Sequence, residues 1–151
     1  MRHHLFTSIL FAFLLSIHCG RISGQTITFQ PTYAGEAIEL NKPYHARKTD
    51  SNIRFELLRF YLSDLVFYQN DQLIHAPERK HWLIDAEEPE SLIFKLDSVD
   101  LSKVNRLVFN LGVDSLTNVS GALGGDLDPT KGMYWSWQSG YVNFKIEGSS
   151  P

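Results

Sequence analysis

The chain has 151 residues, which is enough for one domain with a hydrophobic core and too few for two typical domains. Apolar residues make up 43% and aromatic residues 13% of the sequence, and this globular composition excludes an intrinsically disordered chain. The net charge of −3 leaves no basic excess to hold a phosphate backbone, so we expect no nucleic-acid partner. The single cysteine excludes an internal disulfide framework and any cysteine-based zinc site.

Residues 1–24 have the organisation of a signal peptide. A polar start at 2–4 precedes an apolar run of 13 residues, Leu5–Ile17, which is too short to span a bilayer and typical of a signal-peptide core. We predict cleavage after Gly24, export to the periplasm or the cell surface, and no transmembrane span in the rest of the chain. Cys19 leaves a lipoprotein anchor open, and a buried N-terminal helix is a third interpretation.

Residues 25–151 then form the mature domain. They carry 12 Lys and Arg against 17 Asp and Glu, a net charge of −5, and they contain no cysteine. A chain without thiols suits an oxidising compartment.

The mature part has the pattern of an all-β domain, because runs rich in Val, Ile, Phe, Tyr and Thr alternate with Gly, Asn, Asp and Pro. Many short strands favour a sandwich or a barrel. A sandwich would be incomplete at its C-terminal end, because residues 148–151 directly follow a strand. We predict strands, in chain order, at 26–30, 37–40, 53–60, 61–68, 73–75, 81–85, 92–96, 104–112 and 141–146.

Two details of the predicted strands concern the run from 53 to 68. Strict alternation places Ile53, Phe55 and Leu57 on one face and Arg54, Glu56 and Leu58 on the other. The polar pair 63–64 marks a bend or a β-bulge within the run.

Residues 113–131 have low apolar content and three glycines, which predicts a long loop, and long loops in compact domains are often functional. Asp114, Asp126 and Asp128 lie in or beside it. Oxygen ligands on a glycine-rich loop could bind calcium, although the spacing is not that of an EF-hand. The alternative is that the three carboxylates cap turns through hydrogen bonds to the backbone.

The mature chain contains three histidines, His45, His75 and His81, with no compact ligand spacing among them. His81 begins a predicted strand. Each histidine is either a solvent-exposed or capping side chain or a metal ligand.

The segment 132–140, GMYWSWQSG, is the most specific part of the sequence, because Tyr134, Trp135, Trp137 and Tyr141 place four large aromatic residues within eight positions. In a strand, Trp135 and Trp137 would point to the same face. Such a pair can fill the core of a sandwich, or it can form a flat platform for a sugar or a protein partner.

Four motifs in this order and with this spacing resemble the MbnP-like family. They are RFYLSDLVFY at Arg59–Tyr68, WLIDA at Trp82–Ala86, LVFNLGVDSLTNVSG at Leu107–Gly121 and LDPTKGMYWSWQSGYVNFKIEG at Leu127–Gly148. The resemblance covers nearly all of residues 25–151. It implies an exported bacterial protein with an all-β fold, and we predict an antiparallel β-sandwich that is incomplete at its C-terminal end.

The resemblance also implies a metal and a partner. Family members include copper-binding proteins, some of them paired with a dihaem, peroxidase-like protein. In characterised members a tryptophan is oxidised to kynurenine and joins histidines in binding Cu(I). The matching residues here are Trp135 and Trp137, with His81 as the candidate imidazole ligand.

Two departures from the family pattern concern the copper ligands. One copper-binding member has a histidine two residues after the modified tryptophan, where this chain has Trp137 or Ser139. Members usually continue past the motif that ends at Gly148, and a histidine in that continuation supplies a further ligand.

We therefore expect an exported, non-catalytic protein that binds a metal, with copper favoured over calcium. The alternative is a carbohydrate- or partner-binding module that uses Tyr134, Trp135 and Trp137 as its contact surface. A hydrolase is disfavoured because the sequence has no G-x-S-x-G nucleophile elbow. A purely structural domain, in which the tryptophans only fill the core, stays open.

Overall fold

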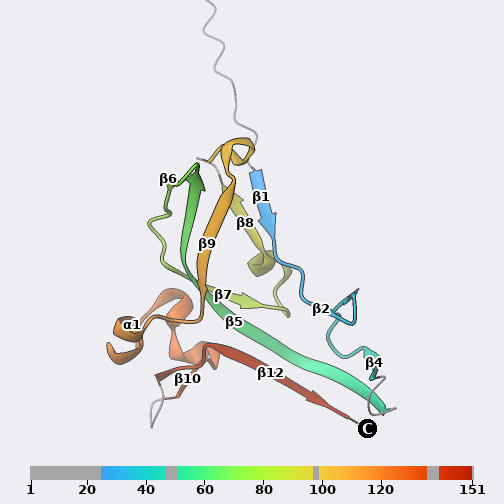
Figure 1. The fold of residues 1–151 in the computed structure, drawn as a ribbon. Coiled ribbons are helices and arrows are strands. Elements are labelled where there is room, and N and C mark those ends of the chain that lie inside the picture. The colour runs from blue at the N-terminus through green and yellow to red at the C-terminus, as the bar shows by residue number, and fades with distance from the viewer. Residues whose placement is uncertain (1–24, 47–50, 97–98, 136–139, 151) are drawn as a thin grey trace, which may run out of the picture.

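The computed structural model describes residues 25–46, 51–96, 99–135 and 140–150, and its centre is one strand of 19 residues, β5 (Ser51–Gln69) (Figure 1). Five strands pair with β5, all antiparallel, and they lie end to end along its two edges. One edge carries β4 (Pro43–Ala46), β7 (His81–Asp85) and β6 (Gln72–His75), and the other carries β12 (Phe144–Ser149) and β9 (Arg106–Leu111).

Two β-bulges interrupt β5. The predicted one is confirmed, because Asp64 has a φ of 50° and the pairing with β9 shifts between Ser63 and Val66. The second was not predicted and lies at Glu56. Glu147 pairs with Leu57 and the next residue, Gly148, pairs with Phe55, so Glu56 is an extra residue of β5 at this point.

The second bulge corrects the expected division of faces. A single extra residue inverts the alternation of a strand. After Glu56 the even-numbered Leu58 and Phe60 therefore face the same side as Ile53 and Phe55, and these four side chains line one groove. The prediction that Leu58 shares a face with Arg54 and Glu56 is wrong.

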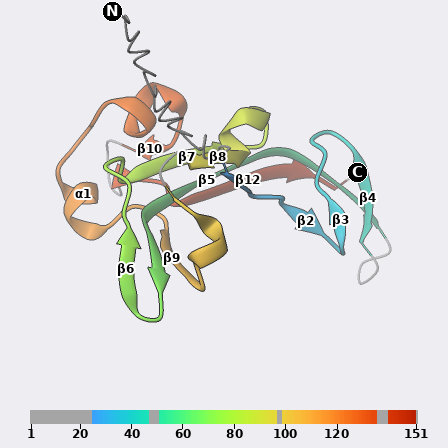
Figure 2. The same cartoon turned by 90° about the horizontal axis from the view of Figure 1, so that it is seen from above.

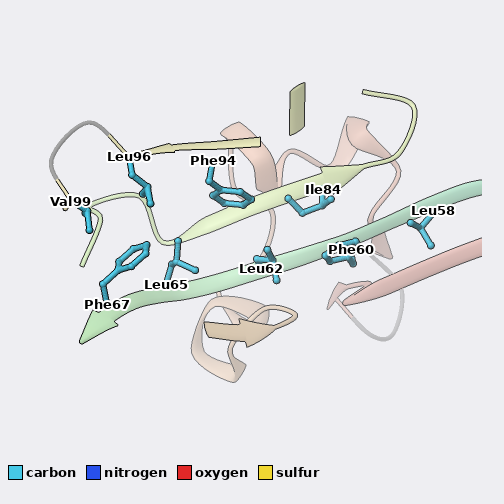
Figure 3. Close-up of a cluster of buried hydrophobic side chains, with 9 residues drawn as sticks. All are labelled: Leu58, Phe60, Leu62, Leu65, Phe67, Ile84, Phe94, Leu96 and Val99. Atoms are coloured by element: carbon cyan, nitrogen blue, oxygen red, sulfur yellow. The ribbon is translucent and has the colours of Figure 1, made fainter. Parts of the chain in front are cut away.

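A small second sheet covers part of the large one. It pairs β1 (Gln25–Thr28) with β8 (Ile93–Leu96) antiparallel. The core lies between the two layers, and Figure 3 shows the side chains of β5 pointing toward β7 and β8. Its buried members are Leu58, Phe60, Leu62, Leu65, Phe67, Ile84, Phe94, Leu96 and Val99.

The remaining elements are short. In place of the predicted strand at 37–40 there is a hairpin of β2 (Thr32–Tyr33) and β3 (Glu36–Ala37), and β4 was not predicted. The segment 113–131 is not an irregular loop, because it contains the helix α1 (Ser115–Val119). The other elements are the 3-10 turns Pro89–Leu92, Leu101–Lys103, Gly125–Leu127 and Pro129–Lys131, and the paired strands β10 (Tyr134–Trp135) and β11 (Gly140–Tyr141).

The predicted all-β, antiparallel, sandwich-like fold is confirmed. Seen from above, α1 and the β2–β3 hairpin lie toward opposite ends of β5 (Figure 2). Among the described residues, no helix has the length and apolar character needed to cross a membrane.

Candidate functional site

The segment from 113 to 135, together with β11, packs on the face of β5 that is opposite the core. Tyr61 alternates with Phe60 and Leu62 along the strand, so its side chain points to this other face. There it forms a second buried cluster with Leu127, Met133 and Tyr141. The motifs that the sequence singled out therefore meet on one side of one strand.

Two tyrosine hydroxyls hold the segment in place. The Tyr141 hydroxyl donates to the carbonyl of Leu127 at 3.0 Å and accepts from the amide of Leu123 at 2.8 Å. The Tyr61 hydroxyl donates to the carbonyl of Asp126 at 3.2 Å, and the two rings meet edge to face with centroids 6.0 Å apart. Burial, with nearby Tyr141 and Asp126 adding to it, raises the pKa of Tyr61 well above its ordinary value.

Helix α1 begins at Asp114, which is its N-cap. The carboxylate accepts from the backbone amide of Thr117 at 3.0 Å and from its hydroxyl at 2.6 Å. The Nε2 atom of His81 lies 3.4 Å from the same carboxylate. The hydrogen bonds from Thr117 have the largest effect on the carboxyl group, and together with the contact to His81 they lower the pKa of Asp114 to about 2.

The other two loop carboxylates also face protein donors. Asp126 accepts from the Leu83 amide at 2.8 Å, from Lys131 at 3.0 Å and from Arg79. Burial opposes ionisation of Asp126, but these donors outweigh it and lower the pKa of its carboxyl group. Asp128 caps the 3-10 turn that follows it, and hydrogen bonds from Thr130 lower its pKa. Calcium binding by this loop stays a prediction.

The structure separates the three histidines. His45 pairs with Asn52 and His81 with Ser63, eleven residues along β5, or roughly 35 Å at the rise of a strand. His75 lies against the ring of Phe67 on the core face, whereas His81 is on the opposite face, beside Asp114. No two of these imidazoles can therefore share one ion within the described fold.

One serine, one histidine and one aspartate do come close together. Ser63 is paired across the strands with His81, which contacts Asp114. Ser63 is fully buried, and its Oγ has no hydrogen-bond partner in the described part of the chain. A nucleophile needs contact with substrate, so this burial gives no support to hydrolysis.

The described ends of the aromatic motif, β10 and β11, pair as a hairpin whose residues differ in exposure. Tyr134 pairs with Tyr141, and the two rings pack edge to face with centroids 4.9 Å apart. Trp135 pairs with Gly140, and its side chain is 61% exposed. The common face of Trp135 and Trp137 stays a prediction, because Trp137 belongs to the segment 136–139, which lies outside the described residues.

The hairpin is fixed to α1 through Asn118, which is not among the predicted metal or contact residues. Asn118 accepts from the amide of Tyr141 at 2.6 Å through its side chain. Gly140, with a φ of 70°, lies so close to Asn118 that a Cβ would collide with it. Gly140, the cross-strand partner of Trp135, is therefore fixed against α1.

A comparison with protein-family models matches residues 23–151 to MbnP. The chain belongs to the MbnP family. No curated protein and no solved structure matches it. The match starts at the end of the predicted signal peptide. It includes the segment 113–135, which packs on the face of β5 that carries Tyr61, called the tyrosine face below.

The described residues of this MbnP chain supply few ligands for copper. Among residues 25–46, 51–96, 99–135 and 140–150, no group of three or more His, Cys, Asp or Glu side chains could hold a metal ion. The donors that suit copper are imidazoles. His81 contacts Asp114 of the segment that carries the hairpin, whereas His75 lies on the core face and His45 lies toward the far end of β5. The described side chains alone therefore do not form a complete copper site.

Proposed function

We propose that this MbnP protein is exported and binds copper without catalysing a reaction. Family membership supports the proposal, and so does the start of the match at residue 23, after the apolar run of the predicted signal peptide. The observation that carries it is the exposure of Trp135. In the same hairpin Tyr141 is buried, so Trp135 is not needed to fill the core.

The exposure of Trp135 matters because an intact indole is a poor metal ligand, so the ring must be accessible to an oxidant before it can bind a metal. Oxidation to kynurenine gives the side chain an aniline nitrogen and a carbonyl, either of which can face a metal. That reaction requires an external oxidant at the ring. A dihaem, peroxidase-like partner would supply it, and a ring that is 61% exposed is open to such a protein.

His81 is the described imidazole best placed to join the hairpin. It is linked to α1 through Asp114, and α1 is linked to the hairpin through Asn118, one helical turn further on. A soft, low-coordinate copper(I) ion suits imidazole nitrogen. Calcium is the weaker alternative, because the carboxylates of Asp114, Asp126 and Asp128 already accept hydrogen bonds from protein donors.

The test combines copper titration of the full chain with mass spectrometry of the peptide 135–141. We expect bound copper and the mass gain of kynurenine, lost in either W135F or W137F, which identifies the modified residue. His81→Asn should weaken copper binding, and His45→Asn, on a distant strand, is the matched control. Absence of both copper and the mass gain would contradict the proposal.

A second candidate function is binding of a carbohydrate or a protein partner through the same end of the molecule. Leu116 and Val119 of α1 are exposed like Trp135. Tyr134 would contribute little, because its ring packs on Tyr141. This function predicts that ligands quench the Trp135 fluorescence of copper-free, unmodified protein, and that Leu116→Ser weakens binding without changing copper content.

A further inference from the structure

Helix α1 is oriented the opposite way round from an ordinary surface helix. Its polar residues face the protein, because Asn118 accepts a hydrogen bond from a backbone amide of β11 and the N-cap Asp114 contacts His81. Leu116 and Val119, three residues apart and therefore on one side of the helix, are 77% and 79% exposed. A surface helix normally buries its apolar side, so this orientation leaves two apolar side chains for an outside contact.

The turn that follows α1 also faces solvent. A Cβ added at Gly121, Gly124 or Gly125 would meet no atom within 4 Å beyond its chain neighbours. The side chain of Leu123 is 39% exposed. In both views α1 lies at the periphery of the molecule, toward the end away from the β2–β3 hairpin (Figure 1, Figure 2). The helix and the turn, residues 115–125, therefore form a protruding surface, called the apolar tip below.

The apolar tip carries no ionisable side chain, because residues 115–125 contain no Asp, Glu, Lys, Arg or His. The carboxylates at its two ends are held by protein donors. Asp114 accepts hydrogen bonds from Thr117, and Asp126 accepts them from a β7 amide and two basic side chains. Moving the tip out of water therefore strips no charge within it of its hydration, which is the largest cost of entering an apolar phase.

We propose that the apolar tip inserts into the interface of a lipid bilayer. A bilayer accepts any protruding apolar side chain, whereas a protein partner needs a surface of matching shape. Neither of the two large cavities of the described residues includes a residue of the tip, so the tip offers protrusions and no pocket. The hairpin that Asn118 fixes to α1 adds an exposed tryptophan, Trp135, a residue type that is enriched at bilayer interfaces.

The experiment places an environment-sensitive fluorophore on the apolar tip of the full chain. Cys19→Ser removes the single native thiol, and Val119→Cys then carries the label. With phosphatidylcholine vesicles the emission should shift to the blue and be quenched by lipids brominated in their acyl chains. The readout is local because the apolar run at 5–17 also has affinity for lipid. Ile93→Cys, 43% exposed on β8 across the core, is the matched control and should show neither change.

A charge placed in the tip tests the contact itself. Leu116→Asp should raise the lipid concentration needed for the blue shift at 119 at least about tenfold, because an apolar contact is lost and a charge must leave water. Ile93→Asp should leave that concentration unchanged. Adding phosphatidylglycerol to the vesicles should not strengthen binding, because the tip is uncharged and the mature chain is acidic. Circular dichroism verifies that the variants are folded.

Three results would overturn the proposal. A label at 119 that stays in water with vesicles present is the first, and it would leave the tip to a protein partner. The second is an equal effect of Leu116→Asp and Ile93→Asp. The third is a blue shift that requires phosphatidylglycerol, which would indicate adsorption through charge. All measurements use copper-free protein, so their outcome is separate from that of the copper titration.

Discussion

The two faces of β5 are stabilised by different kinds of contact. The core face packs Leu58, Phe60 and Leu62 against β7 and β8 through aliphatic and aromatic contacts. The opposite face holds the segment 113–135 through the tyrosine hydroxyls and through Asp and Asn side chains bonded to backbone groups. The free energy gained from apolar contact is roughly proportional to the apolar area buried, whereas hydrogen bonds fix the position and direction of the groups they join.

This difference indicates how one strand supports both a fold and a site. The core face tolerates exchange of similar apolar side chains, because shape and volume are its main requirements. The tyrosine face instead positions Trp135, since Gly140 and Tyr141 are held against Asn118. We therefore expect substitutions on the core face to change global stability, and substitutions on the tyrosine face to loosen the segment locally.

The largest effect is expected from Leu62→Ala. Leu62 is 1% exposed, so its truncation leaves a cavity and should lower the free energy of unfolding by about 2–5 kcal/mol. Leu111→Ala is the matched control, because Leu111 is the direct cross-strand neighbour but is 61% exposed. Denaturant unfolding measures both variants, and equal losses would show that Leu111 is as buried in solution as Leu62.

A smaller, local effect is expected from Tyr141→Phe. Loss of the hydroxyl leaves the Leu123 amide and the Leu127 carbonyl without their partner and should cost about 1–3 kcal/mol. Amide hydrogen exchange should rise in 113–131 and stay low in β7. Tyr61→Phe, which removes only one hydrogen bond, should have about half the effect. If amide hydrogen exchange rose equally in 113–131 and in β7, the segment on the tyrosine face would not open independently of the core.

The smallest effect is expected from Asp114→Ala, which removes the N-cap of α1 at a cost of about 1 kcal/mol at neutral pH. The folded pKa of Asp114, about 2, lies below its ordinary value, so its contribution is present above pH 4 and disappears as the pH falls through 2. The difference in free energy of unfolding between Asp114→Ala and the native chain should shrink as the pH falls from 4 to 2. Asp114→Asn keeps the cap without an ionisable group, so its stability should not show this loss.

Local patterns allowed much of the fold to be predicted. The β-branched and aromatic runs predicted most of the strands of the large sheet, and the polar pair 63–64 predicted the first bulge, because these signals act through near neighbours in the chain. The bulge at Glu56 was not predictable, since it depends on pairing with β12, about ninety residues away. Helix α1 was also missed, because five residues are too few to show a helical period.

The sequence by itself determined the all-β class, the family motifs and the position of the aromatic cluster, because composition, alternation and spacing are properties of the chain. Only the tertiary structure decided that Tyr141 is buried while Trp135 is exposed. It also decided that His81 lies beside Asp114, away from the other two histidines of the mature chain. The physical reason is that burial and ligand proximity depend on contacts between segments far apart in the chain, whose register is set by the bulges and pairing of β5.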